Sequence, residues 1–221
     1  MSMSIQTATA ADLRSIATVA LGTYLDNEMH RRCLALPPPS TDVKLSEWER
    51  YEEHLAYQEY NMSRWFKPCA LVLKAIDEAT GGVVGYCVWS GMLGCYKSPG
   101  DGEAFRHEVP LPERADTEFI ASYNEKVTAV YREVLRGRRN VAFILAIGVL
   151  ASHRRQGIAR KLVRAGLEKG DAAGQAAYVE STDLAVGLYE QLGFVAVTEV
   201  ESTEGYKQTI LLREAPLKQD D

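Results

Sequence analysis

Runs of apolar residues, some continuous and some alternating with polar ones, recur along the chain and are typical of β-strands. They lie at residues 5–9, 70–76, 83–88, 141–150, 176–180, 194–200 and 208–213. A short polar stretch that ends in two glycines separates the second run from the third, which predicts a hairpin. The last two runs form a second strand pair, and helical patterns lie between the remaining strands. This order predicts an α+β fold around one mixed sheet.

Apolar residues that recur at helical spacing predict the helices between these strands. One helix begins at Ala11 and runs through Leu21 to Tyr24, and another extends from Ser46 to Met62. The three later helices are each expected to bury one apolar stripe. These stripes are Ile120, Tyr123, Val127, Val130 and Val134; Ile158, Leu162 and Ala165; and Leu184, Leu188 and Leu192. Asp183 is a candidate cap for the last helix.

Two segments interrupt the regular order of strands and helices. Three consecutive prolines at 37–39 cannot continue a helix, and residues 91–112 are rich in glycine and proline. A loop of that length inside a compact domain often covers or binds a ligand. We expect one domain over residues 1–221, with insertions at about 40–66 and 94–136.

Composition narrows the classes of function. The chain has 221 residues, is 46% hydrophobic and carries a net charge of −5, which argues against general affinity for nucleic acid or anionic membranes. Its four cysteines form no Cys-x-x-Cys pair and no metal-type spacing with the four histidines. We therefore expect no metal and mostly buried, reduced thiols. No signal peptide, membrane-spanning stretch or lipidation motif is found, so the expected location is cytoplasmic, which leaves room for a nuclear pool.

The stretch 147–163 carries the strongest chemical signal. The end of an apolar strand turns through the basic sequence Ser-His-Arg-Arg-Gln-Gly at 152–157 and then opens a helix. Backbone N–H groups and the helix dipole converge at such a turn, which favours a phosphate or pyrophosphate. Gly157 gives the turn conformational freedom, and Ala159 adds little bulk. Three side chains add positive charge: Arg154, Arg155 and Arg160.

Neither common nucleotide signature occurs in the chain, which contains no G-x-x-x-x-G-K-[ST] and no G-x-G-x-x-G. Arg154-x-x-Gly157-x-Ala159, preceded by Ile147-x-Val149, instead resembles the acyl-CoA motif Q/R-x-x-G-x-G/A of the GNAT superfamily, the acetyl-CoA-dependent N-acetyltransferases. Downstream, Leu-Tyr-Glu-Gln-Leu-Gly-Phe at 188–194 resembles the L-Y-E-x-x-G-F element of that family. Two motifs in the right order are hard to obtain by accident, and the chain is therefore identified as a member of this superfamily.

The resemblance implies the GNAT fold, a mixed and mostly antiparallel sheet of about seven strands flanked by helices. In that fold the strands ending near Val149 and Glu180 splay apart and form a wedge for coenzyme A. Backbone groups of Ile147, Gly148 and Val149 would bind the pantetheine arm. The pyrophosphate would lie on the turn and the helix start, at Arg154, Arg155, Gln156, Gly157, Ile158, Ala159 and Arg160. Acetyl-CoA is thus the expected co-substrate.

Acyl transfer to an amine needs a deprotonated amine and a proton for the leaving thiolate. The family often uses the tyrosine of the L-Y-E element as the acid, and the resemblance gives this role to Tyr189. A packed core tyrosine is the alternative interpretation. Glu180 ends the strand beside the expected wedge and is the candidate base, but a solvated strand-end carboxylate fits the pattern equally well. His153, Asp116 and Glu118 are further candidate bases.

Two positions depart from the family pattern. Ala151 replaces a frequent proline after the strand, and Thr182 stands where many members carry asparagine. Thr182 is retained as a candidate cofactor-binding residue, although an asparagine-dependent contact with coenzyme A is in doubt. The segment Glu180-Ser-Thr182 resembles a variant in some eukaryotic microbial members, so we expect a fungal-like member.

The residues leave the acyl acceptor open. The insertions and their surroundings contain acids and aromatics that would suit a cationic amine with an apolar body, and a solvated acidic loop is an equal alternative. These residues are Trp48, Trp65, Trp89, Tyr96, Glu103, Phe105, Glu108, Glu113, Asp116 and Glu118. We expect a small-molecule primary amine, because no second module for recognising a protein is seen. The alternatives are a protein or peptide acceptor, a non-catalytic acyl-CoA-binding protein, and a site for another nucleotide. Monomer and homodimer both stay open.

Overall fold

The computed structural model describes residues 2–24, 27–34, 50–92, 95, 114–201 and 205–216. These residues form a seven-stranded sheet with the order β1-β2-β3-β4-β5-β7-β6. All neighbouring strands are antiparallel except β4 and β5, which are parallel. The strands are β1 (Met3–Thr7), β2 (Ala70–Asp77), β3 (Gly82–Ser90), β4 (Val141–Val149), β5 (Ala176–Ser181), β6 (Val195–Glu201) and β7 (Lys207–Arg213). The predicted α+β fold with one mixed, mostly antiparallel sheet is therefore confirmed.

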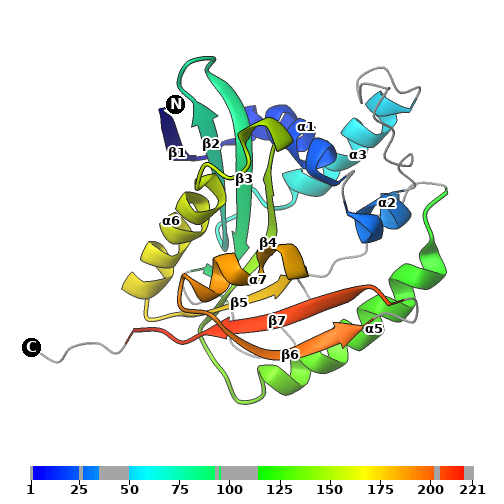
Figure 1. The fold of residues 1–221 in the computed structure, drawn as a ribbon, viewed down its shortest axis with the longest axis vertical. Coiled ribbons are helices and arrows are strands. Elements are labelled where there is room, and N and C mark those ends of the chain that lie inside the picture. The colour runs from blue at the N-terminus through cyan, green and yellow to red at the C-terminus, as the bar shows by residue number, and fades with distance from the viewer. Residues whose placement is uncertain are drawn as a thin grey trace, which may run out of the picture.

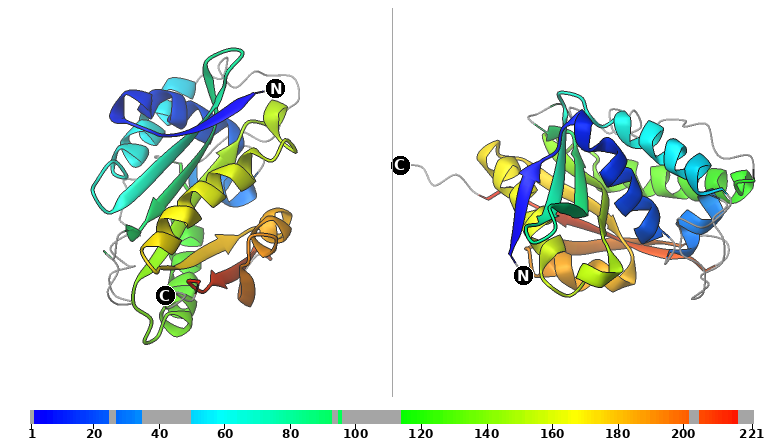
Figure 2. Two further views of the ribbon diagram at one scale, coloured as in Figure 1. Left: turned by 90° about the vertical axis from the view of Figure 1, so that its left-hand side faces the viewer. Right: turned by 90° about the horizontal axis from the view of Figure 1, so that it is seen from above.

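Helices cover both faces of this sheet (Figures 1 and 2). Side chains of α1, α3 and α5 pack on one face, which we call the α1 face. Side chains of α6 and α7 pack on the opposite face, which we call the α6 face. The helices are α1 (Leu13–Tyr24), α2 (Glu28–Leu34), α3 (Tyr51–Ser63), α5 (Thr117–Val134), α6 (Ile158–Ala172) and α7 (Asp183–Glu190), with short 3-10 turns at Ala10–Asp12 and Ala151–His153.

The helix α2 is anchored to the start of α5. The Arg32 guanidinium donates to the Asp116 carboxylate, with Nε at 3.1 Å, and it lies over the Phe119 ring at 4.1 Å. Asp116 also caps α5, because its Oδ1 accepts from the Phe119 backbone N–H at 3.0 Å. These contacts fix α2 beside the start of α5.

Two helices bury stripes that differ from the predicted ones. In α5, Tyr123 and Val127 are buried as predicted, but Phe119 and Tyr131 complete the stripe because they fit the aromatic cluster on the α1 face. In α7, Leu184 is 98% exposed, and the buried residue is the tyrosine of the L-Y-E motif. Nearly every residue of this short helix is apolar or small, so its pattern leaves the buried side undetermined.

The N-terminal cap of α7 also differs from the prediction. Thr182 occupies the cap position, and Asp183 is the first helical residue. The predicted helix at 46–62 is present as α3 from Tyr51 onward. The residues 35–49 and 96–113, which include Trp48, Tyr96, Phe105 and the acids from Glu103 to Glu113, lie outside the described residues.

The expectation of reduced thiols is wrong for one pair of cysteines. Cys69 and Cys95 form a disulfide, with their Cα atoms 5.8 Å apart, and it ties the start of β2 to the segment after β3. Cys33 and Cys87 are free thiols. Burial raises the pKa of the Cys33 thiol to about 11, which keeps it protonated and unreactive at neutral pH. Within the described residues, no helix is long and apolar enough to cross a bilayer.

Candidate active site

The parallel strands β4 and β5 separate toward their carboxyl ends. They pair only from Val141 to Ile144 of β4 and from Ala176 to Val179 of β5. Beyond these positions no described strand pairs with the β4 edge that faces β5, so its N–H and C=O groups can bind a ligand. The predicted splay of these two strands is therefore present.

A bulge in β4 lies where the splay begins. Ala146 pairs with Val88 and Ile144 pairs with Trp89, which leaves Leu145 as the extra residue. Such a bulge bends its strand and reverses the faces to which the following side chains point. Ile144 before the bulge and Ile147 after it both pack on the α6 face, as this reversal requires.

A cavity of about 420 Å³ fills the space between the splayed strands, and we call it the wedge cavity. Consecutive residues line it on both strands, at 143–147 and at 178–182. Successive strand residues point to opposite faces, so the wedge cavity is open to both sides of the sheet. Its other lining residues are Thr23, Tyr24, Asn27, Met29, His30, Trp65, Tyr131, Ala185, Tyr189 and Gln208.

A second cavity, of about 630 Å³, adjoins the wedge cavity and reaches the motif turn. We call it the turn cavity. The two cavities adjoin, because Ile147, Thr182 and Tyr189 line both of them. Several positions predicted to bind coenzyme A line the turn cavity, namely Ile147, Gly148, Val149, Arg154, Ala159 and Thr182.

The motif turn directs backbone N–H groups toward open space. Arg155 and Gly157 have left-handed backbone, with φ angles of 63° and 75°. Gly157 caps α6 without a side-chain hydrogen bond, and the first turn of α6 contains no acidic residue. Since the first N–H groups of a helix have no acceptor within it, they are available to an anion. A Cβ placed on Gly157 would meet no atom within 4 Å, so the space before the turn is open.

Side chains around the motif turn differ in whether they face the turn cavity. Arg154 lines the turn cavity, and its Nε donates to the Val149 carbonyl oxygen at 3.2 Å. Arg160 donates to the Gln191 amide oxygen at the end of α7. Arg155 and Gln156 are exposed, and the Ile158 side chain is buried in the core. Ile158 can therefore face a ligand only through its backbone.

Tyr189 is brought to the junction of the two cavities. Its side chain is 2% exposed, and its ring packs edge-on against Phe194 with centroids 5.5 Å apart. Burial raises the pKa of its hydroxyl well above the usual value, with a smaller contribution from the Cys87 thiol. The hydroxyl is therefore neutral at neutral pH and can donate a hydrogen bond, while its raised pKa makes it a weaker acid than a free phenol.

Glu180 reaches the wedge cavity from the other side of the sheet. It lies two residues after Tyr178, which is buried on the α1 face, and it points to that same face. The Tyr178 hydroxyl donates to Glu180 Oε1 at 3.2 Å. Tyr189 packs in the core of the α6 face. The carboxylate and the phenol therefore approach the wedge cavity from opposite faces.

The other candidate bases lie elsewhere. His153 lines neither the wedge cavity nor the turn cavity, and it lies with its Nε2 3.8 Å from Asp77 Oδ2 and its Nδ1 2.8 Å from Ser152 Oγ. Asp116 is engaged by Arg32 and the start of α5, and Glu118 is exposed. Among the described residues, no group of three or more His, Cys, Asp or Glu side chains could hold a metal ion.

No motif marks His30, which also lines the wedge cavity. Its ring stacks on Tyr24, with centroids 4.0 Å apart and an interplanar angle of 7°. Its Nδ1 is buried and has no hydrogen-bond partner among the described residues. Burial lowers the pKa of the imidazole to about 4, so the ring is neutral at neutral pH. His30 belongs to a short helix without a motif, and only the tertiary fold brings it to the site.

Comparisons with known proteins identify the family. The model of the Acetyltransferase (GNAT) family matches residues 40–194, which is more than half of the chain. No curated protein sequence matches the chain, and the comparisons give no support to a fungal-like lineage.

Solved structures share the fold at low sequence identity. A Corynebacterium glutamicum structure described as histone acetyltransferase HPA2 and related acetyltransferase has a TM-score of 0.63 and 19% identity over 100% of both chains. An aminoglycoside 6'-acetyltransferase type Ii has a TM-score of 0.56 and 12% identity, over 98% of this chain and 99% of that one. The yncA protein from Salmonella typhimurium, solved with its cofactor acetyl-CoA, has a TM-score of 0.52 and 14% identity, over 100% of this chain and 98% of that one. With the fold and the family match in agreement, this chain belongs to the GNAT family and is an acetyltransferase of the acetyl-CoA-dependent type.

Proposed function

We propose that this enzyme transfers the acetyl group of acetyl-CoA to a primary amine of a small molecule, by direct attack within a ternary complex. The wedge cavity carries this proposal, because a carboxylate and a protonated phenol enter it from opposite faces of the sheet. Its volume of about 420 Å³ falls within the range of small-molecule sites, about 300–1,000 Å³.

The residues of the turn cavity fit acetyl-CoA. The N–H groups of residues 155–160 would hold the pyrophosphate, and Arg154 would add positive charge beside them. The unpaired edge of Ile147, Gly148 and Val149 would bind the amides of the pantetheine arm, with Thr182 on the opposite wall. Acetyl-CoA supplies an activated thioester, and these residues hold it in one orientation beside the wedge cavity.

Glu180 would prepare the acceptor. An alkyl amine is mostly protonated at neutral pH and becomes a nucleophile only after losing a proton. A carboxylate in the wedge cavity first attracts the cationic amine and then accepts its proton, directly or through water. The Tyr178 hydroxyl, 3.2 Å from Oε1, holds the carboxylate in place.

Tyr189 would act on the side of the leaving group. Tyr189 lines both cavities, and its phenol is in the neutral form at neutral pH. A thiolate that leaves there would receive the phenolic proton. Holding the amine and the thioester next to each other in adjoining cavities removes much of the entropic barrier to their reaction.

The proposal is tested by measuring thiol release from acetyl-CoA across a panel of small amines, amino sugars and peptides. Turnover with small amines, and much weaker turnover with peptides, is the expected result. Preferential acetylation of peptides or proteins would favour the alternative acceptor class. Tight binding of coenzyme A without thiol release for any acceptor would favour a non-catalytic acyl-CoA-binding protein.

A further inference from the structure

A third cavity, of about 230 Å³, extends the wedge cavity on the α1 face, and we call it the side chamber. The two spaces adjoin, because both are lined by Tyr24, His30, Trp65, Leu145 and Ala146. Neither Tyr189 nor Glu180 lines the side chamber. Its position therefore suits the part of an acceptor molecule that does not react.

A buried amide oxygen on the wall of the side chamber has no hydrogen-bond partner among the described residues. Gln58 is 1% exposed, and its Oε1 makes no hydrogen bond with any described residue. The residue belongs to the buried side of α3, between Leu55 and Met62. An unsatisfied buried oxygen is destabilising, and it calls for an explanation in terms of function or a bound group. The Nδ1 of His30 is a second such atom on the same wall.

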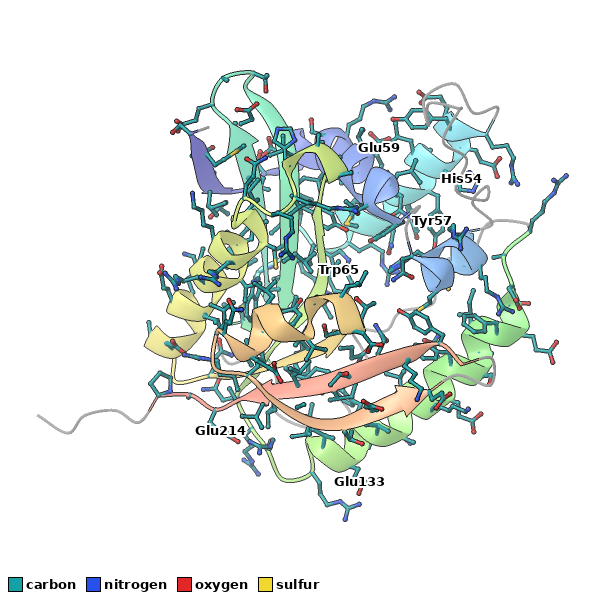
Figure 3. All side chains as sticks on the ribbon, in the orientation of Figure 1. His54, Tyr57, Glu59, Trp65, Glu133 and Glu214 are labelled. Atoms are coloured by element: carbon teal, nitrogen blue, oxygen red, sulfur yellow. A yellow bond between two sulfur atoms is a disulfide. The ribbon has the colours of Figure 1, made fainter. Side chains whose placement is uncertain are left out.

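Flat rings form much of the remaining wall of the side chamber. The stacked pair of Tyr24 and His30, together with Tyr57 and Trp65, lines it (Figure 3, where Tyr57 and Trp65 are labelled). An apolar cavity of about 150 Å³ holds one benzene ring. A volume of about 230 Å³ therefore accommodates a single ring with a substituent.

Among the described residues, the charged side chain of the acceptor site lies in the wedge cavity and not in the side chamber. No Asp, Glu, Lys or Arg is among the described residues that line the side chamber, whereas Glu180 lines the adjoining wedge cavity. A second ammonium group or a carboxylate in the side chamber would be buried without a counter-charge, which costs free energy. The lining therefore disfavours polyamines and amino acids.

We propose that the acceptor is a monoamine whose far end is a flat, uncharged ring carrying a hydrogen-bond donor, such as a phenol. The amine lies beside Glu180, the ring lies in the side chamber, and the donor binds Gln58 Oε1. This inference rests on the proposed transfer to a small amine and specifies the substrate class for the same site.

Three matched acceptors test the inference by steady-state thiol release from acetyl-CoA. Tyramine carries the phenol, phenethylamine lacks it, and spermidine is a polyamine. The wild-type enzyme is expected to use tyramine with a kcat/KM about tenfold above that of phenethylamine, and spermidine least well. The substitution Gln58→Met keeps the side-chain length and removes the amide, so it is expected to bring the two arylalkylamines within about twofold of each other. Tyr60→Phe, at a 55% exposed position of the same helix, is the control that keeps the preference.

A folding check accompanies the kinetics. Gln58→Met is expected to bind coenzyme A as tightly as the wild type, and its melting temperature should not fall, because the variant loses a buried amide oxygen that has no partner among the described residues. Equal use of tyramine and phenethylamine by the wild type, a preference for spermidine, or a tyramine preference retained in Gln58→Met would each overturn the inference alone. Thiol release with none of the small amines would instead overturn the proposed function, and the inference with it.

Discussion

At the scale of single residues, the surroundings of two side chains determine what each can do. Tyr189 is buried in the core of the α6 face, where the charged phenolate is disfavoured and the neutral hydroxyl persists. Glu180 lies on the α1 face beside the Tyr178 hydroxyl, which stabilises the carboxylate in one position. The proposed acid and base thus differ in environment and in the side of the sheet from which they act.

Replacing the Tyr189 hydroxyl tests its role as the acid. We expect Tyr189→Phe to lower kcat well over tenfold, with little change in the dissociation constant for coenzyme A, because the ring still packs and only the proton is lost. Thiol-release kinetics and calorimetry measure the two quantities. Tyr60→Phe makes the same chemical change at an exposed site and should alter neither. Unchanged kinetics in Tyr189→Phe would remove the proposed role.

Gly157 tests the anion site through a matched pair of glycines. Gly157 and Gly81 have similar φ angles of 75° and 70°, and neither has an atom within 4 Å of an added Cβ. An alanine at either position should therefore carry a similar backbone strain of about 1 kcal/mol. We expect Gly157→Ala to weaken coenzyme A binding about tenfold, because the methyl group enters the space before the N–H groups. Gly81→Ala, on the β2–β3 turn, should bind like the wild type, and equal affinities in both variants would contradict the assignment.

The buried imidazole of His30 predicts a pH dependence of stability. Its pKa is lowered from 6.5 to about 4 in the folded state, so the unfolded chain takes up the proton first as pH falls. The His30 contribution to stability is therefore complete above pH 6.5 and is lost as pH falls through about 4, by at most about 3 kcal/mol. Urea unfolding of the wild type and of His30→Phe between pH 7 and pH 4 should show a steeper decline for the wild type. Parallel curves would show that the imidazole titrates normally.

Some of these residues were predictable from the chain and others were not. Tyr189, Glu180 and Arg154 lie in or beside the two motifs, and the structure places all of them at the two adjoining cavities. His30 lies in a helix without a motif, so no local pattern marks it. Gln58 differs, because it is a polar residue on the buried side of α3, next to Leu55 and Met62. The sequence alone would have pointed to it only if the buried side of this helix had been known.

At the scale of elements, the bulge and the splay of β4 turn a regular sheet into a site. The bulge at Leu145 reverses the direction of the following side chains, and pairing with β5 stops beyond Ile144. Close packing on both faces then holds the separated strands. On the α6 face, Gly166 of α6 lies against the Trp89 ring of β3. On the α1 face, Gly148 lies against Thr23 of α1.

The contact between α6 and β3 can be tested with a second pair of glycines. A Cβ on Gly166 would lie 2.1 Å from Trp89 Nε1, whereas a Cβ on Gly187 of α7 would meet no atom within 4 Å. We expect Gly166→Ala to lower the free energy of unfolding by about 1–3 kcal/mol through overpacking. Gly187→Ala should raise it by about 0.5–1 kcal/mol, because alanine favours a helix more than glycine does. Denaturant unfolding measures both, and a stable Gly166→Ala variant would show that α6 packs less closely on the sheet.

The residue ranges of the strands and helices were predicted better than the side that each helix buries against the sheet. All seven strands lie close to the predicted ranges, because β-branched runs and glycine turns are local signals. The prediction of which side of α7 is buried was wrong, because Leu184 is exposed and Tyr189 is buried. The rotation of a short apolar helix is decided by the cavity against which it packs, and this information is not in the helix itself.

At the scale of the whole molecule, the sheet separates the two proposed substrates. The turn cavity lies beside α6 and α7, and the side chamber lies beside α2 and α3, with the wedge cavity between them. The contacts of Arg32 with Asp116 join α2 to α5, and the disulfide between Cys69 and Cys95 fixes the segment after β3. Each link joins parts of the chain that are distant in sequence. Neither link could be predicted from spacing, because each joins segments that only the fold brings together.

A crystal structure with coenzyme A bound tests the central claim most directly. We expect the pyrophosphate against the N–H groups of residues 155–160, the pantetheine arm along Ile147, Gly148 and Val149, and the thiol within hydrogen-bond reach of the Tyr189 hydroxyl. Coenzyme A bound elsewhere on the molecule, or with its thiol outside the wedge between β4 and β5, would contradict the account.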